Sequence, residues 1–156
     1  GKLPWIQYND MIVPDSQFCI QFLNAERTID LNKHLTPTQI AIGHLLRKTV
    51  EDSLYWTIVM WRLIFEKTGI VYRKLGLPSA LIWYIRRAAR SGLWSHGIGR
   101  YSQEEVTQIM EADLAAVSQI LGDNNFLFGN DLSDVSEFDC ALFGQLCQLV
   151  WQMPGT

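Results

Sequence analysis

The chain has 156 residues, which is about the length of one domain. Hydrophobic residues make up 48% and charged residues 19%, which excludes disordered, collagen-like and disulfide-rich chains and favours a globular domain with one core. Its 13 basic and 16 acidic residues give a formal charge of −3. Because binding to phosphates needs a net basic face, we expect no nucleic acid among the partners.

Two short β-type runs open the chain. Residues 5–8 and 11–13 are separated by the turn pair at residues 9–10, so we expect a hairpin. The second run leads into Asp15 and Ser16, where we expect a short helix with Ser16 as its N-cap.

After a polar link through Asp30 and Lys33 the chain has helical periodicity. Residues 36–39 are a well-formed helix start, with an N-cap Thr, a Pro at the first helical position and a Gln three residues after the cap. Apolar residues then recur every three to four positions and predict one long helix to about Lys67. Residues 54–65 are apolar nearly all round, so this half should form the buried centre of a bundle.

Three further helices follow in the pattern. One covers residues 79–93, the next opens at the capping box of residues 102–105 and stops at Gly122, and the last opens at residues 136–139. We therefore predict a mainly α fold, a helical bundle preceded by a β-hairpin and one helix.

The spacing of the cysteines and the sequence of the first residues indicate where in the cell we expect the protein. Cys19, Cys140 and Cys147 form no C-x-x-C pair, which suits a reducing compartment, so we expect an intracellular, cytoplasmic protein. No uncharged stretch reaches the roughly 18 strongly apolar residues that a membrane span needs. Residues 1–5 have neither an initiator Met nor the pattern of a signal peptide, so we expect a piece of a longer protein.

Charge is unevenly distributed along the chain. Residues 62–100 hold eight basic residues and one acid, whereas residues 101–156 hold nine acids and no Lys or Arg. The two blocks are either solvated faces that attract each other in the fold, or they include a basic patch. The patch, through Arg86, Arg87 and Arg90, would face an acidic partner or an anionic membrane surface.

No metal-ligand spacing, P-loop or complete dinucleotide fingerprint is present, so we predict no metal site. Two segments suit an anion. At Ser16 a helix N-terminus offers peptide N–H groups, although Ser16 would equally serve only as a cap. At residues 96–100 two glycines and Arg100 precede another helix start, although a tight loop whose Arg pairs with an acid explains the same residues.

The order of these features resembles a known family. Leu3-Pro4, the hairpin, Asp15-Ser16 and a following all-helical domain resemble the end of the thioredoxin-like domain of glutathione transferases joined to their C-terminal domain. Residues 126–129 and 136–139 resemble the segment that opens the core helix of that second domain.

Within this superfamily the chain is similar to the metaxin-related branch and its failed axon connections proteins. Four blocks carry this resemblance: Lys2 to Asp10, Val13 to Leu23, His96 to Ser102, and Met153 to Thr156. The cadmium-responsive proteins of nematodes share the architecture and remain an alternative.

The resemblance implies a domain division and a half-site for glutathione. Residues 1–25 would be the C-terminal part of the thioredoxin-like domain, and residues 26–156 the helical domain. Four residues match the family's glutathione contacts: Leu3, Pro4, Asp15 and Ser16. The resemblance implies that the Leu3–Pro4 peptide bond is cis and that the backbone of Leu3 binds the cysteinyl part of glutathione. It also implies that Asp15 and Ser16 hold the γ-glutamyl end of the tripeptide.

The catalytic Tyr, Ser or Cys of the family lies near the end of the first strand, a segment that is absent here, so we predict no catalytic residue. We expect a protein of this fold that acts through protein partners rather than catalysis, in axon development or at a membrane by resemblance. The alternative is a glutathione-dependent transferase or a cadmium- or stress-detoxifying enzyme. The resemblance implies glutathione as the cofactor. Both a monomer and a dimer are compatible with the sequence.

Overall fold

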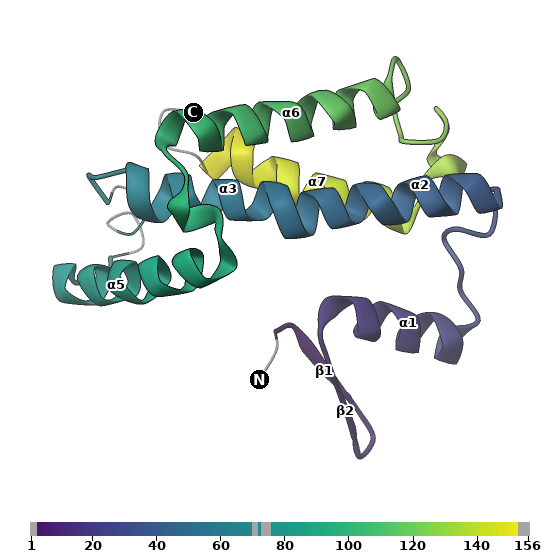
Figure 1. The fold of residues 1–156 in the computed structure, drawn as a ribbon. Coiled ribbons are helices and arrows are strands. Elements are labelled where there is room, and N and C mark those ends of the chain that lie inside the picture. Colours follow the sequence, from purple (N-terminus) through teal and green to yellow (C-terminus); the bar gives the residue numbers. More distant parts are fainter. Residues whose placement is uncertain (1–2, 70–71, 73–75, 153–156) are drawn as a thin grey trace. The chain divides into compact units, whose positions relative to one another are not determined.

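The structure, a computed structural model, describes residues 3–69, 72 and 76–152. The chain divides into two compact units, Gly1–His34 and Leu35–Thr156 (Figure 1). The family-domain boundary expected after residue 25 stays a prediction.

The N-terminal unit holds the predicted hairpin. Strands β1 (Trp5–Tyr8) and β2 (Met11–Pro14) pair antiparallel. The turn between them places Asn9 at φ 53°, a left-handed conformation that Asn adopts more readily than most residues. The hairpin expected from the sequence is thus confirmed.

Helix α1 (Ser16–Arg27) follows β2 directly and packs on the hairpin. The ring of Phe22 meets that of Tyr8 edge to face, with 5.4 Å between centroids. The buried Cys19 thiol donates a hydrogen bond to the carbonyl of Val13 at 3.1 Å. These contacts fix the position of the helix start relative to the strands.

The predicted long helix is a continuous helical stretch in the C-terminal unit, but its hydrogen bonding changes along the way. Helix α2 (Pro37–Lys48) passes into the π-helical η1 (Thr49–Leu54), then α3 (Tyr55–Met60), then the π-helical η2 (Trp61–Phe65). Both bonds of the capping box expected at Thr36 are present. The periodicity of apolar residues did not predict that two segments of this helix have the wider π-helical turns.

The remaining helices pack around this stretch, as Figure 1 shows for α6 and α7. They are α5 (Ser79–His96), the 3₁₀ turn η3 (Ile98–Arg100), α6 (Gln103–Leu121), the 3₁₀ turn η4 (Leu132–Asp134) and α7 (Glu137–Gln152). The Ser102 capping box and the stop at Gly122, which has φ 57°, are confirmed.

Two apolar clusters form the core of the C-terminal unit. The larger surrounds Val50, Leu54 and Ile58, which are fully buried between α6 and α7. The smaller joins α3, α5 and α6 through residues that include Met60 and Leu93. Burying one such side chain contributes about 1.5–3 kcal/mol. The buried centre expected at residues 54–65 lies further toward the start of the stretch, because fully buried side chains run from Val50 to Met60 and η2 has none.

None of the helices within the described ranges is both long enough and apolar enough to cross a bilayer.

Candidate functional site

The hairpin brings the four predicted glutathione contacts together at one end of the N-terminal unit. Because Trp5 pairs with Pro14, the residues just outside this pair lie next to each other. The peptide N–H of Asp15 donates a hydrogen bond to the carbonyl of Pro4 at 2.8 Å. The Leu3–Pro4 peptide bond is cis.

Asp15, not Ser16, is the N-cap of α1. The Asp15 carboxylate accepts a hydrogen bond from the peptide N–H of Gln17 at 3.1 Å, and Ser16 is the first helical residue. The expectation of a Ser16 cap was therefore wrong, because a carboxylate caps as well as a hydroxyl and Asp15 reaches the helix first. The Ser16 hydroxyl lies exposed and, within the described residues, has no hydrogen-bond partner.

Asp15 also has an unusual backbone, with φ 81° and ψ 133°. A residue other than glycine held at positive φ costs about 1–3 kcal/mol and is found preferentially where ligands bind. Here the conformation turns the chain sharply from β2 into α1. The peptide groups at the helix start consequently lie at the surface beside Pro4.

The charges at this point suit a zwitterion. The N-terminus of α1 favours negative charge, and the Asp15 carboxylate already binds the peptide N–H of Gln17 there. Asp15 supplies a negative charge for an ammonium group one residue away. An acceptor carboxylate beside donor N–H and hydroxyl groups matches the α-amino and α-carboxylate groups of an amino acid.

The three cysteines are free, and two lie on α7. Cys19 is the buried residue of α1, and its thiol donates a hydrogen bond to the carbonyl of Val13 on β2, so its role is packing. No group of three or more potential metal ligands occurs within the described residues.

The second candidate segment, residues 96–100, forms a tight connection. Gly97 ends α5 at φ 108°, a conformation that strongly favours glycine. A Cβ on Gly99 would lie 2.8 Å from the backbone of Leu93 and Trp94, so only glycine allows this close approach. The two glycines therefore serve the fold of the connection.

Arg100 does not form the expected ion pair with an acid in the described part of the chain. Its guanidinium lies over the ring of Trp94 at 5.5 Å. Pairing with an acid was thus wrong. Cation–π contact with an aromatic ring replaces it.

A cavity of about 440 Å³ lies beside this connection and includes side chains that the sequence analysis had not grouped. The His96 ring lies 4.5 Å from the ring of Trp56, which sits forty positions earlier on α3. Asp52, also on the wall, is paired with Lys48 at 3.2 Å. No local pattern could have joined His96 to Trp56, because their contact depends on how α5 packs on α3.

Among the described basic residues of 62–100, Arg62 and Arg86 bind oxygen atoms of the fold. Arg62 donates to the side-chain and backbone oxygens of Gln148 at 2.9 and 2.8 Å, and burial lowers its pKa. Arg86 binds the carboxylate of Glu66 at 3.3 Å. Arg73 and Lys74, like the closing block at residues 153–156, lie outside the described residues.

Comparison with known proteins matches both halves of the chain. The glutathione S-transferase N-terminal domain model matches residues 1–68, and the C-terminal domain model of the same family matches residues 110–156. No solved structure gives a significant match.

Two curated relatives align with 94% of the chain. One is "Failed axon connections" from Drosophila melanogaster, at 25% identity over 162 residues. Another is "Isoprene-epoxide–glutathione S-transferase" from Rhodococcus sp. (strain AD45), at 28% identity over 156 residues. The chain spans 39% and 64% of their respective lengths. With both domain models matched and the hairpin and helices in the expected order, the chain belongs to the glutathione S-transferase family.

Proposed function

We propose that this protein binds glutathione through its N-terminal unit, with Leu3, Pro4, Asp15 and Ser16 as the contacts. The observation that carries the proposal is the start of α1, where the Asp15 carboxylate and the exposed Ser16 hydroxyl lie beside Pro4. The Rhodococcus relative, whose name states that it is a glutathione S-transferase, supports the same ligand.

Each group has a defined task in this proposal. The peptide N–H and the hydroxyl of Ser16 bind the carboxylate of the γ-glutamyl end, and Asp15 binds its ammonium group. The Leu3 backbone has no hydrogen bond to another described residue, so it is available to the cysteinyl peptide. The set binds and orients the tripeptide, and catalysis would need a further group near the sulfur to activate the thiol.

Calorimetric titration of glutathione into the full-length protein tests this proposal. We expect saturable binding that Ser16→Ala weakens about tenfold, or about 1.4 kcal/mol, because one hydrogen-bond donor to a carboxylate is lost. The matched control is Ser118→Ala, which removes an exposed hydroxyl on α6. Absence of binding to the folded protein, or equal weakening by both variants, contradicts the proposal.

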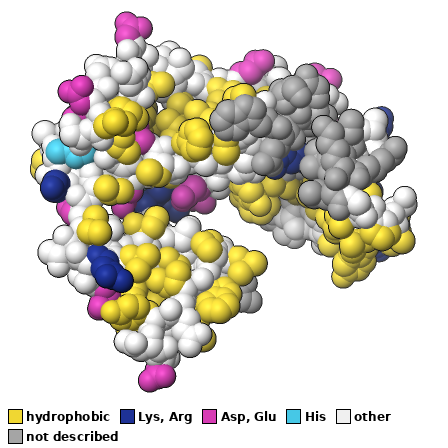
Figure 2. All heavy atoms as spheres, turned by 180° about the vertical axis from the view of Figure 1, so that it is seen from behind, with side chains coloured by type: hydrophobic (Ala, Val, Ile, Leu, Met, Phe, Trp, Pro, Cys, Tyr) yellow, Lys and Arg dark blue, Asp and Glu magenta, His cyan; other side chains and the backbone are white. Residues whose placement is uncertain are grey.

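A second candidate function, contact with a protein partner, is favoured by apolar side chains on the N-terminal unit. Trp5, Ile12 and Phe18 are each more than half exposed, and hydrophobic atoms gather on the face of this unit that Figure 2 presents. Exposed apolar patches of this kind are typical of interaction surfaces.

Affinity purification of the full-length protein separates the two functions. If the contact function is right, Trp5→Ser with Ile12→Ser loses a specific partner while glutathione affinity and the circular dichroism spectrum stay unchanged. An unchanged set of partners contradicts the contact function and leaves glutathione binding untouched.

A further inference from the structure

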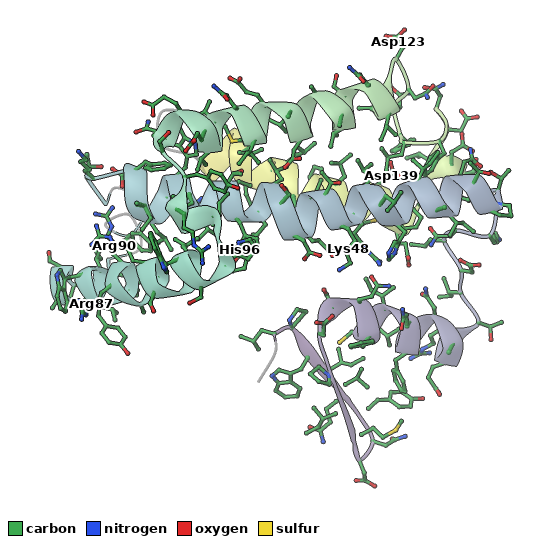
Figure 3. All side chains as sticks on the ribbon, in the orientation of Figure 1. Lys48, Arg87, Arg90, His96, Asp123 and Asp139 are labelled. Carbon is green, nitrogen blue, oxygen red and sulfur yellow. The ribbon has the colours of Figure 1, made fainter. Side chains whose placement is uncertain are left out.

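One face of α5 carries two exposed tryptophans with two arginines between them. Trp83, Arg87, Arg90 and Trp94 follow the spacing i, i+4, i+7 and i+11, which places them on one side of the helix over about 16 Å. Trp83 is 65% and Trp94 60% exposed, and both arginines are exposed. Figure 3 shows the two arginines on α5. We call these four residues the α5 stripe.

The charge of the stripe is not compensated within the described residues. No ion pair reaches Arg87 or Arg90, and Arg100 adds a third guanidinium by lying over Trp94. Between Glu66 and Glu104 the sequence has seven basic residues and no acid. This surface therefore attracts anions.

Glu66 does not alter this balance, because its carboxylate is already engaged. It accepts hydrogen bonds from the peptide N–H groups of Thr68 and Gly69 at 2.5 and 2.6 Å and pairs with Arg86. Arg86 points toward that carboxylate and is not part of the stripe, although the sequence grouped it with Arg87 and Arg90.

An apolar hollow of about 250 Å³ adjoins the stripe. Met60, Ile64 and Leu93 line it, and Arg90 and Trp94 share its wall. A ligand surface that fits here combines anionic groups for the guanidinium groups with apolar material for the hollow. Phospholipid bilayers have this combination, with phosphate and carboxylate groups above acyl chains.

We propose that the α5 stripe docks on the surface of an anionic lipid bilayer. Trp83 and Trp94 lie in the headgroup layer, where amphipathic indole rings are favoured. Arg87, Arg90 and Arg100 bind lipid phosphates, which guanidinium groups hold in bidentate fashion.

A bilayer explains the stripe better than a nucleic acid does. Tryptophan and arginine also bind single strands, but residues 101–156 carry nine acids and no Lys or Arg. A flexible polyanion that follows the surface would meet this acidic part, whereas a flat bilayer touches one basic face only.

The docking surface is independent of the glutathione half-site, because the four residues of the half-site belong to the N-terminal unit and the α5 stripe belongs to the C-terminal unit.

Sedimentation of the full-length protein with vesicles tests the proposal. We compare vesicles of about one part phosphatidylserine to three parts phosphatidylcholine with vesicles of phosphatidylcholine alone. We expect binding to the anionic vesicles that weakens as salt is raised, because screening shortens the reach of the arginine charges. Arg87→Gln with Arg90→Gln should reduce the partition coefficient by about tenfold or more.

The matched control is Arg27→Gln with Lys33→Gln, which removes the same charge from the N-terminal unit. Trp83→Ala should weaken binding to anionic vesicles while keeping its salt dependence, since it removes the apolar contact and leaves the charges. Equal binding to both kinds of vesicle, no binding, or an equal effect of the control variant overturns the proposal. A dimer that the arginine variant abolishes in the absence of vesicle binding overturns it in favour of a second copy.

Discussion

Gly43 on α2 lies directly beneath the ring of Phe138, the second residue of α7. A Cβ at this position would overlap three ring carbons, and the ring is only 4% exposed, so it has no free space to move into. The glycine is thus needed for the packing of α7 on α2.

Gly43→Ala should lower the free energy of unfolding by about 1–3 kcal/mol, because the buried ring must shift. Gly92→Ala, on the exposed side of α5 with no atom within 4 Å of the new methyl, is the control and should stabilise by up to about 1 kcal/mol. Urea unfolding of both variants measures the difference. Equal effects would mean that helix propensity, not contact with Phe138, governs position 43.

The carboxyl group of Glu66 makes the stability of the folded protein depend on pH. Burial raises the pKa of its carboxyl, but hydrogen bonds from Thr68 and Gly69 and the charge of Arg86 together lower the pKa below its ordinary value of 4.5. Because the folded-state pKa is the lower one, the stabilisation is present above the unfolded-state pKa and is lost as pH falls through the folded-state pKa. Glu66 therefore contributes to acid unfolding.

Glu66→Gln should cost about 1–3 kcal/mol at neutral pH, because Arg86 loses its charged partner. The variant should also lose less stability than the parent on acidification below about pH 4.5. Urea unfolding at neutral and acidic pH checks both, with the exposed Glu111→Gln as control. The same acid dependence in parent and Glu66→Gln would exclude this role.

At the scale of elements, Asp139 joins the start of α7 to the loop that precedes it. One oxygen accepts hydrogen bonds from the hydroxyl and peptide N–H of Ser136 at 2.6 and 2.9 Å, and the other from the peptide N–H of Leu127 at 2.7 Å. Ser136 is fully buried and Leu127 belongs to the larger core cluster. The predicted capping box is confirmed and also anchors this loop.

Asp139→Ala should reduce the free energy of unfolding by about 2–4 kcal/mol, since half of the capping box is lost and the donors of Ser136 and Leu127 are left without a partner. The control is Asp123→Ala, on the exposed loop after α6 (Figure 3). Thermal and urea unfolding report the loss. A change no larger than that of the control would show that other contacts hold the loop.

At the scale of the whole molecule, both core clusters lie entirely within the unit Leu35–Thr156. A chain of residues 35–156 should therefore keep its helical circular dichroism and a cooperative thermal transition, because every residue of both clusters belongs to this unit. Broad unfolding of the shortened chain, with loss of near-ultraviolet circular dichroism, would show that its core needs the N-terminal unit.

Local chemistry was sufficient to predict much of the fold. The hairpin and the capping boxes at Thr36 and Ser102 depend on residues a few positions apart, so their pattern is visible in the sequence. The hydrogen bond from Asp15 to Pro4 follows from the hairpin register. Where two neighbours had equal capping chemistry, as at the start of α1, the sequence could not choose between them.

The sequence by itself determined the kinds of elements, their ends and the unequal distribution of charge, since these depend on neighbouring residues and on composition. The tertiary structure alone decided the stacking of His96 on Trp56, the binding of Arg62 to Gln148, and the π turns of the long helical stretch. Periodicity identifies which face of a helix is buried, but the side chain that a face meets depends on how separate helices pack. Arg86 and Arg87 show this difference: they are neighbours in the sequence, but within the described structure only Arg86 forms an ion pair, with Glu66.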